Sequence, residues 1–162
     1  ETLAALADDA GDPDATVGHA GVGDLARATA EKLKAQGVTS VTVRLDDTLF
    51  TGPTWNDGWE SGNESYVAKI QPIMLDVTAH EASGDYPADP ALEAAQVFAT
   101  HLGEAGVTVT GDVSRAAAAS GDLLAQLLGE LGEVERLQQL ADGLGADQRG
   151  EGVLANSSWA RM

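Results

Sequence analysis

The stretch that decides the fold is residues 38–59, which reads VTSVTVRLDDTLFTGPTWNDGW. Residues 41–45 alternate between apolar and polar side chains, which is the period-two pattern of a half-buried β-strand. The Gly52-Pro53 pair then predicts a turn into a loop that carries Trp55 and Trp59. A strand that leads into an aromatic loop is therefore the first prediction for this chain.

Helices are predicted on both sides of this stretch. The first covers residues 24–36, with Asp24 as its cap, and its inward face comprises Leu25, Ala28, Thr29 and Leu33. The second begins at Asp89-Pro90, and its apolar stripe comprises Leu92, Ala95, Phe98, Ala99 and Leu102. Gly37 and Gly106 can take the left-handed conformation that ends each helix.

The order helix, glycine, valine, strand occurs twice, at residues 24–45 and 90–113, the second strand being formed by valines 107, 109 and 113. This organisation favours an α/β fold, a small sheet with packed helices, because each thin apolar stripe needs a sheet on which to bury itself. Residues 66–77 are predicted to be extended, with Pro72 better suited to an edge or a bend than to a central strand.

Four segments are expected along the chain. Residues 1–16 are predicted to be a linker or short helix, 17–115 the α/β domain, 116–144 an amphipathic helical segment and 145–162 a flexible tail. The third segment is rich in leucine and would dock on the core or on another protein, with the possible partner surface formed by Leu124, Leu127 and Leu131.

Composition excludes several classes of function. The formal charge is −17, from 26 acidic and 9 basic residues, which argues against nucleic acid and anionic membranes as partners. The sequence contains no cysteine, so it has no disulfide or thiolate chemistry, and no apolar run is long enough to span a membrane. The amino terminus lacks the basic and apolar regions of a signal peptide. Because the sequence begins at Glu1 rather than Met, it is expected to be a fragment or a processed form.

Three local patterns are interpreted structurally rather than as sites. Asp46 and Asp47 follow a strand on opposite faces, so Asp47 is expected to cap the turn while Asp46 is solvated or pairs with Arg44. The glycines of residues 18–23 lack dinucleotide-loop spacing and predict a flexible turn. No metal site or cofactor is predicted, because the three histidines, 19, 80 and 101, are widely separated.

Several motifs carry a family resemblance over about residues 17–126. They are Ala35–Val38, Asp46–Phe50, Gly52-Pro53, Gly58-Trp59, Tyr66–Ala68 and Ala105–Val113. With these motifs the chain resembles the domain inserted in serine-type D-alanyl-D-alanine carboxypeptidases and endopeptidases, the class C low-molecular-mass penicillin-binding proteins. The resemblance implies an extracytoplasmic bacterial protein that processes peptidoglycan, within a parent enzyme that transfers an acyl group to a serine.

The same resemblance implies a substrate-contacting rim. In the family, aromatic side chains of this loop hold a side chain of the peptidoglycan stem peptide, and the matching positions here are Trp59 and Tyr66. The family's acidic residue, which binds the substrate's amino group, falls near Ser61, which is not acidic, and Glu60 or Glu64 could substitute for it. The alternative is that Trp55, Trp59 and Tyr66 only pack the loop onto the sheet.

Catalytic residues are not predicted in this chain. The Ser-x-x-Lys and Lys-Thr-Gly motifs of the family are absent, and Ser65 and Lys69 are four residues apart rather than three. Residues 61–63 match Ser-x-Asn, but this three-residue match lies inside the aromatic loop and is interpreted as chance. The sequence therefore predicts one of two functions: a non-catalytic portion of a cell-wall carboxypeptidase, or a stand-alone interaction module that binds a partner through its leucines.

Overall fold

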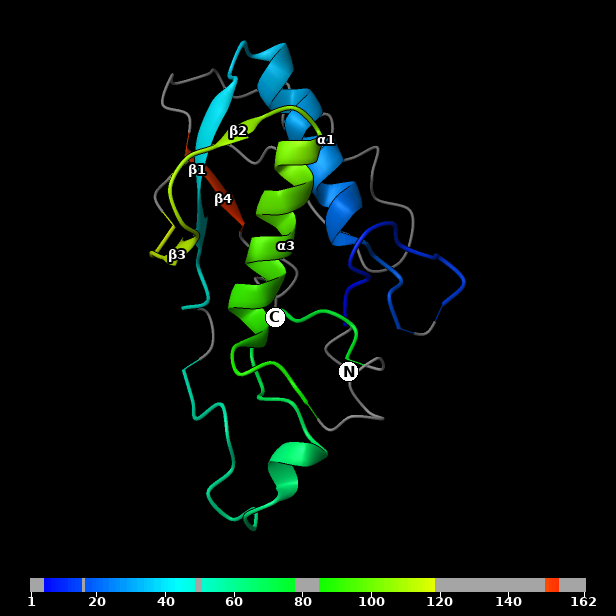
Figure 1. The fold of residues 1–162 in the computed structure, drawn as a ribbon, viewed down its shortest axis with the longest axis vertical. Helices are drawn as coiled ribbons and strands as arrows, with labels where there is room; N and C mark the ends of the chain where they lie inside the picture. The colour runs from blue at the N-terminus through cyan, green and yellow to red at the C-terminus, as the bar shows by residue number, and fades with distance from the viewer. Residues whose placement is uncertain (1–4, 16, 49–50, 78–84, 119–150, 155–162) are drawn as a thin grey trace, which may run out of the picture.

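The computed structural model describes residues 5–15, 17–48, 51–77 and 85–118 and the backbone of residues 151–154. Two helices lie beside a parallel sheet (Figure 1), as predicted from the alternation of elements. The elements are α1 (Val22–Ala35), β1 (Ser40–Leu45), the short 3-10 helix η1 (Asn63–Ser65), α3 (Pro90–Glu104), β2 (Thr108–Val109), β3 (Ser114–Arg115) and β4 (Glu151–Leu154).

Helix α1 starts two residues before the predicted position. Its N-cap is Gly21, which has no side chain to bond the first amides, and Asp24 lies within the first turn instead of capping it. There a carboxylate still interacts favourably with the positive end of the helix dipole. The predicted inward residue Ala28 is exposed, and Ala26 and Ala30 are buried in its place. Gly37 does take a positive φ, 75°, after the helix ends.

Helix α3 is confirmed in detail. Asp89 caps it by accepting a hydrogen bond from the amide of Leu92 at 3.2 Å, and Pro90 occupies the first helical position. Gly106 has a φ of 84° just beyond its end. Ala91 and Ala94 are fully buried in addition to most of the predicted stripe, because the small side chains let the helix approach the sheet closely.

Strand β1 is the centre of the sheet, and its three partners run parallel to it. Carbonyls two residues apart in a strand point to the same edge. The amides of residues 108, 110 and 116 donate to the carbonyls of Thr39, Val41 and Leu45, so β2 and β3 lie along one edge. Arg44 pairs with both β3 and β4, which places β4 on the opposite edge.

Of the predicted strand 107–113, only β2 is formed, and the pairing with β1 resumes just after it, in β3. Between their pairs β1 advances three residues, from Val41 to Arg44, while the partner advances five, from Val109 to Ser114. The two extra residues form a bulge at Gly111, whose φ is 71°. The sequence pattern did not show this interruption because valines lie on both sides of it, at positions 109 and 113.

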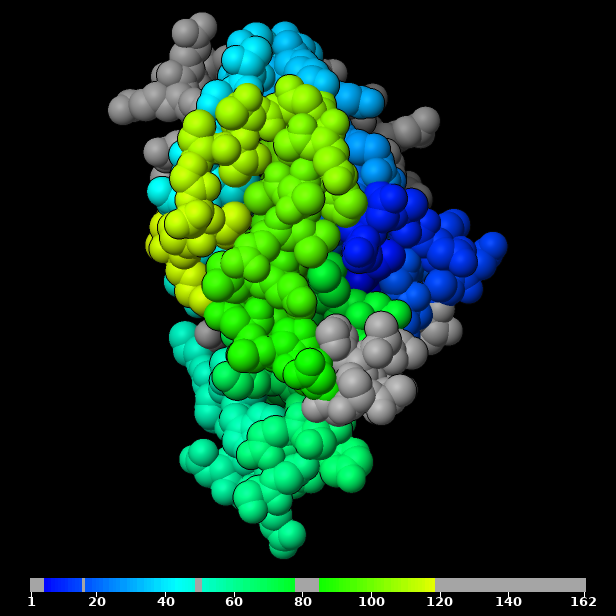
Figure 2. All heavy atoms as spheres, viewed as in Figure 1, coloured from blue at the N-terminus to red at the C-terminus, as the bar shows by residue number. Residues whose placement is uncertain are grey.

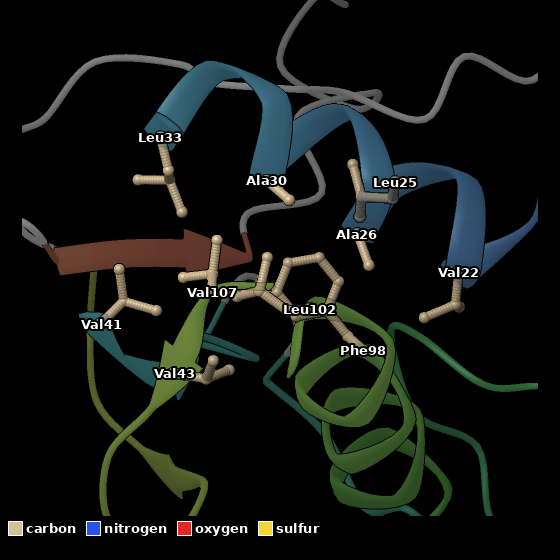
Figure 3. Close-up of a cluster of buried hydrophobic side chains, with 10 residues drawn as sticks. All are labelled: Val22, Leu25, Ala26, Ala30, Leu33, Val41, Val43, Phe98, Leu102 and Val107. Atoms are coloured by element: carbon tan, nitrogen blue, oxygen red, sulfur yellow. The ribbon is translucent and has the colours of Figure 1, made fainter. Parts of the chain in front are cut away.

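Both helices cover the same face of the sheet. The buried side chains of β1, at positions 41, 43 and 45, point to that face, while Thr42 and Arg44 point away from it. Figure 3 shows Phe98 and Leu102 of α3 directed towards the apolar face of α1. The main cluster comprises Val22, Leu25, Ala26, Ala30, Leu33, Val41, Val43, Phe98, Leu102 and Val107. A smaller cluster joins Leu45 to Ala91 and Ala95.

The amino-terminal segment joins two distant parts of the chain. Leu6 forms a parallel bridge with Leu75, and Ala7 forms one with Gly21. A β-carbon on Gly21 would lie 2.1 Å from the carbonyl oxygen of Asp9, so only glycine fits at this crossing. The region that was predicted to be a flexible turn is therefore a closely packed junction, and the prediction of flexibility was wrong.

Three further predictions differ from the structure or lie outside the described residues. Residues 66–77 do not form a strand, since their ordered pairing is limited to the bridge at Leu75. Residues 151–154, predicted to be part of a flexible tail, form β4. Leu124, Leu127 and Leu131 lie outside the described residues. In the described part of the chain, neither α1 nor α3 has the length and apolar character needed to cross a bilayer.

Candidate functional site

The aromatic loop, defined as residues 51–77, extends beyond one end of the α/β layer (Figure 1) and returns to the layer at Ile73 and Leu75, which pack against the core clusters. It follows the carboxyl end of β1 and precedes the amino end of α3. Figure 2 shows it as a lobe that extends past α3. In open parallel sheets, the carboxyl ends of the strands are the usual place for binding sites, because the loops there can vary without disturbing the core.

Trp55 and Trp59 pack against each other within this loop. Their ring centroids are 4.8 Å apart and the ring planes are at 88°, which is an edge-to-face arrangement. Asn56 builds the turn between them: its carbonyl accepts from the amide of Trp59 and its side-chain oxygen accepts from the amide of Gly58, both at 2.9 Å. Both indoles are half-buried, so each keeps part of its surface exposed.

Tyr66 lies on the same loop but is not packed against the tryptophans. It follows η1 and is 77% exposed. The ring contact found in the described part of the chain joins Trp55 and Trp59 and does not include Tyr66. The Ile70 amide donates to the Thr54 carbonyl at 2.9 Å, which closes the segment that carries all three aromatic residues. The interpretation that these residues only pack the loop onto the sheet does not fit the exposure of Tyr66.

Ser61 is exposed between Trp59 and Tyr66 in the sequence, and a carboxylate is held beside it. Glu64 accepts a hydrogen bond from the amide of Gly62 at 2.6 Å. Gly62 itself has a φ of 104°, which a residue with a side chain rarely adopts. The backbone of Glu60 accepts from the side-chain amide of Asn63 at 3.1 Å. The loop thus places a carboxylate next to the position where the sequence has a serine.

An arginine joins the two ends of the segment between β1 and α3. The guanidinium of Arg115 donates to Asp47 at 2.7 Å and to both oxygens of Asp89 at 2.8 and 2.9 Å. The bonds from Arg115 lower the pKa of Asp89 to about 2, despite an opposing effect of partial burial. Sequence reasoning missed this arginine because Asp47 and Asp89 come together only in the folded chain.

The predicted roles of Asp46 and Asp47 are exchanged in the structure. Asp46 caps the turn by accepting from the amide and hydroxyl of Thr48, at 3.0 and 2.6 Å, and from the amide of Ala118 at 2.6 Å. The bonds from Thr48 and then Ala118 lower the pKa of Asp46. Asp47 pairs with Arg115 instead of capping the turn. Arg44 donates to backbone carbonyls and not to Asp46.

Other polar features do not converge into a site. Among the described residues, no three His, Asp or Glu side chains are close enough to hold a metal ion. His101 lies 2.9 Å from Glu104 and 3.8 Å from Asp8, and His80 is outside the described residues. A groove of about 520 Å³ lies between the amino-terminal segment and α3, lined in part by Asp8, Asp76 and Val97. It is separate from the aromatic pair.

Comparison with known proteins identifies the family. Residues 6–88, which are 83 of the 162 residues, match the model of the D-Ala-D-Ala carboxypeptidase 3 (S13) family. The matched region contains α1, β1 and the aromatic loop and ends just before α3. No curated protein and no solved structure matches the chain significantly. Half of the sequence, including the loop with Trp59 and Tyr66, thus fits one family, and the chain belongs to the D-Ala-D-Ala carboxypeptidase 3 (S13) family.

Proposed function

We propose that this chain is a non-catalytic portion of a bacterial cell-wall D-alanyl-D-alanine carboxypeptidase, and that its aromatic loop contacts the stem peptide of peptidoglycan. The observation that carries the proposal is the family match across the loop, together with the exposure of Tyr66 at its surface. An aromatic side chain that is 77% exposed has not been used to build the core, so it is free to contact a substrate.

The chemistry of the loop suits a peptide side chain that is apolar along its stem and carries an amino group. Trp59 and Tyr66 offer apolar walls, and an indole or phenol face attracts a cation as well as a methylene chain. Glu64, held near Ser61 by the Gly62 amide, offers the negative charge that an ammonium group needs. These groups act by binding and orienting the substrate, and none of them takes part in bond breaking.

The reaction itself is assigned to a parent enzyme. Acyl transfer in this family needs a serine nucleophile with a lysine one helical turn away, and the sequence has no Ser-x-x-Lys. Ser65 and Lys69 do not supply it, because Ser65 belongs to η1 and the helix has ended before Lys69. The parent would act outside the cytoplasm, where peptidoglycan lies.

Titration with a stem-peptide fragment tests the binding part of the proposal. A fragment with a free side-chain amino group should shift the NMR signals of Trp59 and Tyr66 and leave those of α1 unchanged. Trp59→Ala or Tyr66→Ala should weaken binding at least about fivefold, roughly 1 kcal/mol, since each removes one apolar wall. Val17→Ala is the matched control, because Val17 is 45% exposed and lies outside the loop.

Two results would contradict this proposal. One is a titration in which the largest shifts fall outside the aromatic loop. The other is equal affinity of the wild-type chain and the Trp59→Ala variant. Acetylation of the peptide's amino group should weaken binding if Glu64 provides the charge, and Glu64→Gln should remove that difference between the two peptides.

Exposure to a fluorescent penicillin tests the non-catalytic part. We expect no covalent adduct by intact-protein mass spectrometry, since an acyl adduct needs an activated serine. An intact serine carboxypeptidase, labelled in parallel, is the positive control. A stable adduct on any serine of this chain would overturn the assignment of catalysis to a parent enzyme.

A further inference from the structure

The segment from Asp46 to Asp89 is unusually long for a connection between a strand and a helix. In its described part, residues 51–77 contain no regular element other than the single turn of η1. Connections longer than about 15 residues without secondary structure need other contacts to hold a defined shape. The question is therefore which contacts orient the aromatic loop.

Arg115 contacts both ends of this segment at once. Asp47 is the second residue after β1, and Asp89 is the last residue before α3. One guanidinium reaches them with three hydrogen bonds of 2.7 to 2.9 Å, and the two bonds to Asp89 are bidentate. Bidentate pairs between arginine and a carboxylate are the most directional ion pairs in proteins, so this contact fixes a geometry as well as adding attraction.

A second contact connects the middle of the segment to the same place. The side-chain oxygen of Gln71 accepts from the amide of Ala91 at 2.7 Å, and Gln71 also hydrogen-bonds to Asp89. Next to Gln71, Ile70 closes the aromatic part by its bond to Thr54. The orientation of the aromatic residues is thus linked through Gln71 and Asp89 to Arg115.

We propose that Arg115 is a positioning residue for the aromatic loop: it joins the two ends of the segment and so determines the direction in which Trp59 and Tyr66 are presented. The strand and the helix remain held by their own core contacts, since Leu45 packs against Ala91 and Ala95. Loss of Arg115 should therefore loosen the loop without unfolding the α/β layer. We call the hydrogen bonds of Arg115 to Asp47 and Asp89 the clasp. The consequence for substrate binding rests on the proposed function, whereas the clasp itself does not.

Amide hydrogen exchange of the full chain tests this role. In Arg115→Met the amides of Trp59 and Ile70 should exchange about tenfold faster, because the loop can then open without the cost of breaking the hydrogen bonds of Arg115. The core amides of α1 and β1 should keep their exchange rates. Arg115→Lys should give a smaller change, since one ammonium retains the charge but not the bidentate fork. Arg27→Met is the matched control: Arg27 also bridges two aspartates, Asp9 and Asp24, but away from the loop.

Unchanged amide exchange rates of the loop in Arg115→Met would overturn the inference. Equal acceleration of exchange in the loop and in the core would also overturn it, as would an equal acceleration of loop exchange in Arg27→Met. Titration with the stem-peptide fragment separates this inference from the proposed function. Weaker binding by Arg115→Met, together with faster loop exchange, supports both. Faster loop exchange in a chain that does not bind the peptide at all supports the clasp and contradicts the proposed function.

Discussion

At the scale of single residues, Asp89 shows how one side chain serves two structures. Its carboxylate caps α3 through the Leu92 amide and also accepts both bonds of the Arg115 fork. The cap was predictable because Asp-Pro is a common start of a helix. The ion pair was not, because Arg115 lies 26 residues further along the chain and is placed beside Asp89 by the tertiary fold, in which β3 pairs with β1.

Asp89 should make stability depend on acid pH. Its pKa is about 2 in the folded chain and near 3.8 when unfolded, so its contribution is complete above pH 4 and is lost as the pH falls towards 2. Because the side chain is 35% exposed, we expect the loss to be only about 1 kcal/mol. Urea unfolding at pH 5, 3 and 2 should show a shallower decrease for Asp89→Asn than for wild type. Parallel decreases in the two proteins would contradict this assignment.

Leu45 is the residue that fixes the end of β1 next to the loop. It is 1% exposed and packs against Ala91 and Ala95 of α3. Leu45→Ala should lower the free energy of unfolding by about 2 to 5 kcal/mol, because it leaves a cavity between strand and helix. Ile70→Ala is the control: its side chain is 54% exposed, so a change within about 0.5 kcal/mol is expected. Denaturant unfolding of both variants measures the difference.

The candidate site also illustrates what residue patterns can predict. Trp59, Ser61 and Tyr66 were identified from the resemblance to the carboxypeptidase family, and the structure places all three on one loop at the surface. Their relative orientation could not be predicted, since it depends on the turn at Asn56 and on the positive φ of Gly62. Asp46 and Asp47 exchanged their predicted roles for a similar reason: the partners that decide them, Ala118 and Arg115, are distant in sequence.

At the scale of elements, the helices and β1 were predictable because their patterns are local. The alternation in 41–45 and the caps of α3 depend on neighbouring residues alone. The short strands β2, β3 and β4 were harder to predict, since a strand of two to four residues shows too little periodicity and forms only where it can pair with another strand. The stretch 66–77 was predicted to be extended with an edge or a bend at Pro72; it bends at Pro72 and pairs only through the bridge at Leu75, because Pro72 cannot donate to a neighbouring strand.

The junction of the amino-terminal segment with the start of α1 gives a prediction at this scale. Gly21→Ala should destabilise the chain by more than about 2 kcal/mol, because its β-carbon would lie 2.1 Å from the Asp9 carbonyl oxygen and the backbones would have to separate. Gly103→Ala in α3 is the matched control. Nothing lies within 4 Å of its added carbon, so it should stabilise α3 by about 0.5 to 1 kcal/mol. Thermal unfolding measures both, and equal effects would contradict the packing of this junction.

At the scale of the whole molecule, the α/β layer holds the packed core, and we propose that the aromatic loop is the part that contacts the substrate. The core lies between α1, α3 and one face of the sheet, and the loop extends beyond the carboxyl end of β1 (Figures 1 and 3). This difference between the layer and the loop follows from their composition. Apolar side chains concentrate in the helices and in β1, whereas the loop keeps its aromatic residues partly exposed. The leucine-rich segment, with Leu124, Leu127 and Leu131, remains a prediction.

The most direct test of the central proposal is to sequence the gene on both sides of the region that encodes this chain. The account predicts a Ser-x-x-Lys motif upstream, and Ser-x-Asn and Lys-Thr-Gly motifs downstream, in the same reading frame. These three motifs would supply the nucleophile, its proton acceptor and the rest of the acyl-transfer site. A reading frame that contains none of them would contradict the assignment to a parent carboxypeptidase and favour an interaction module.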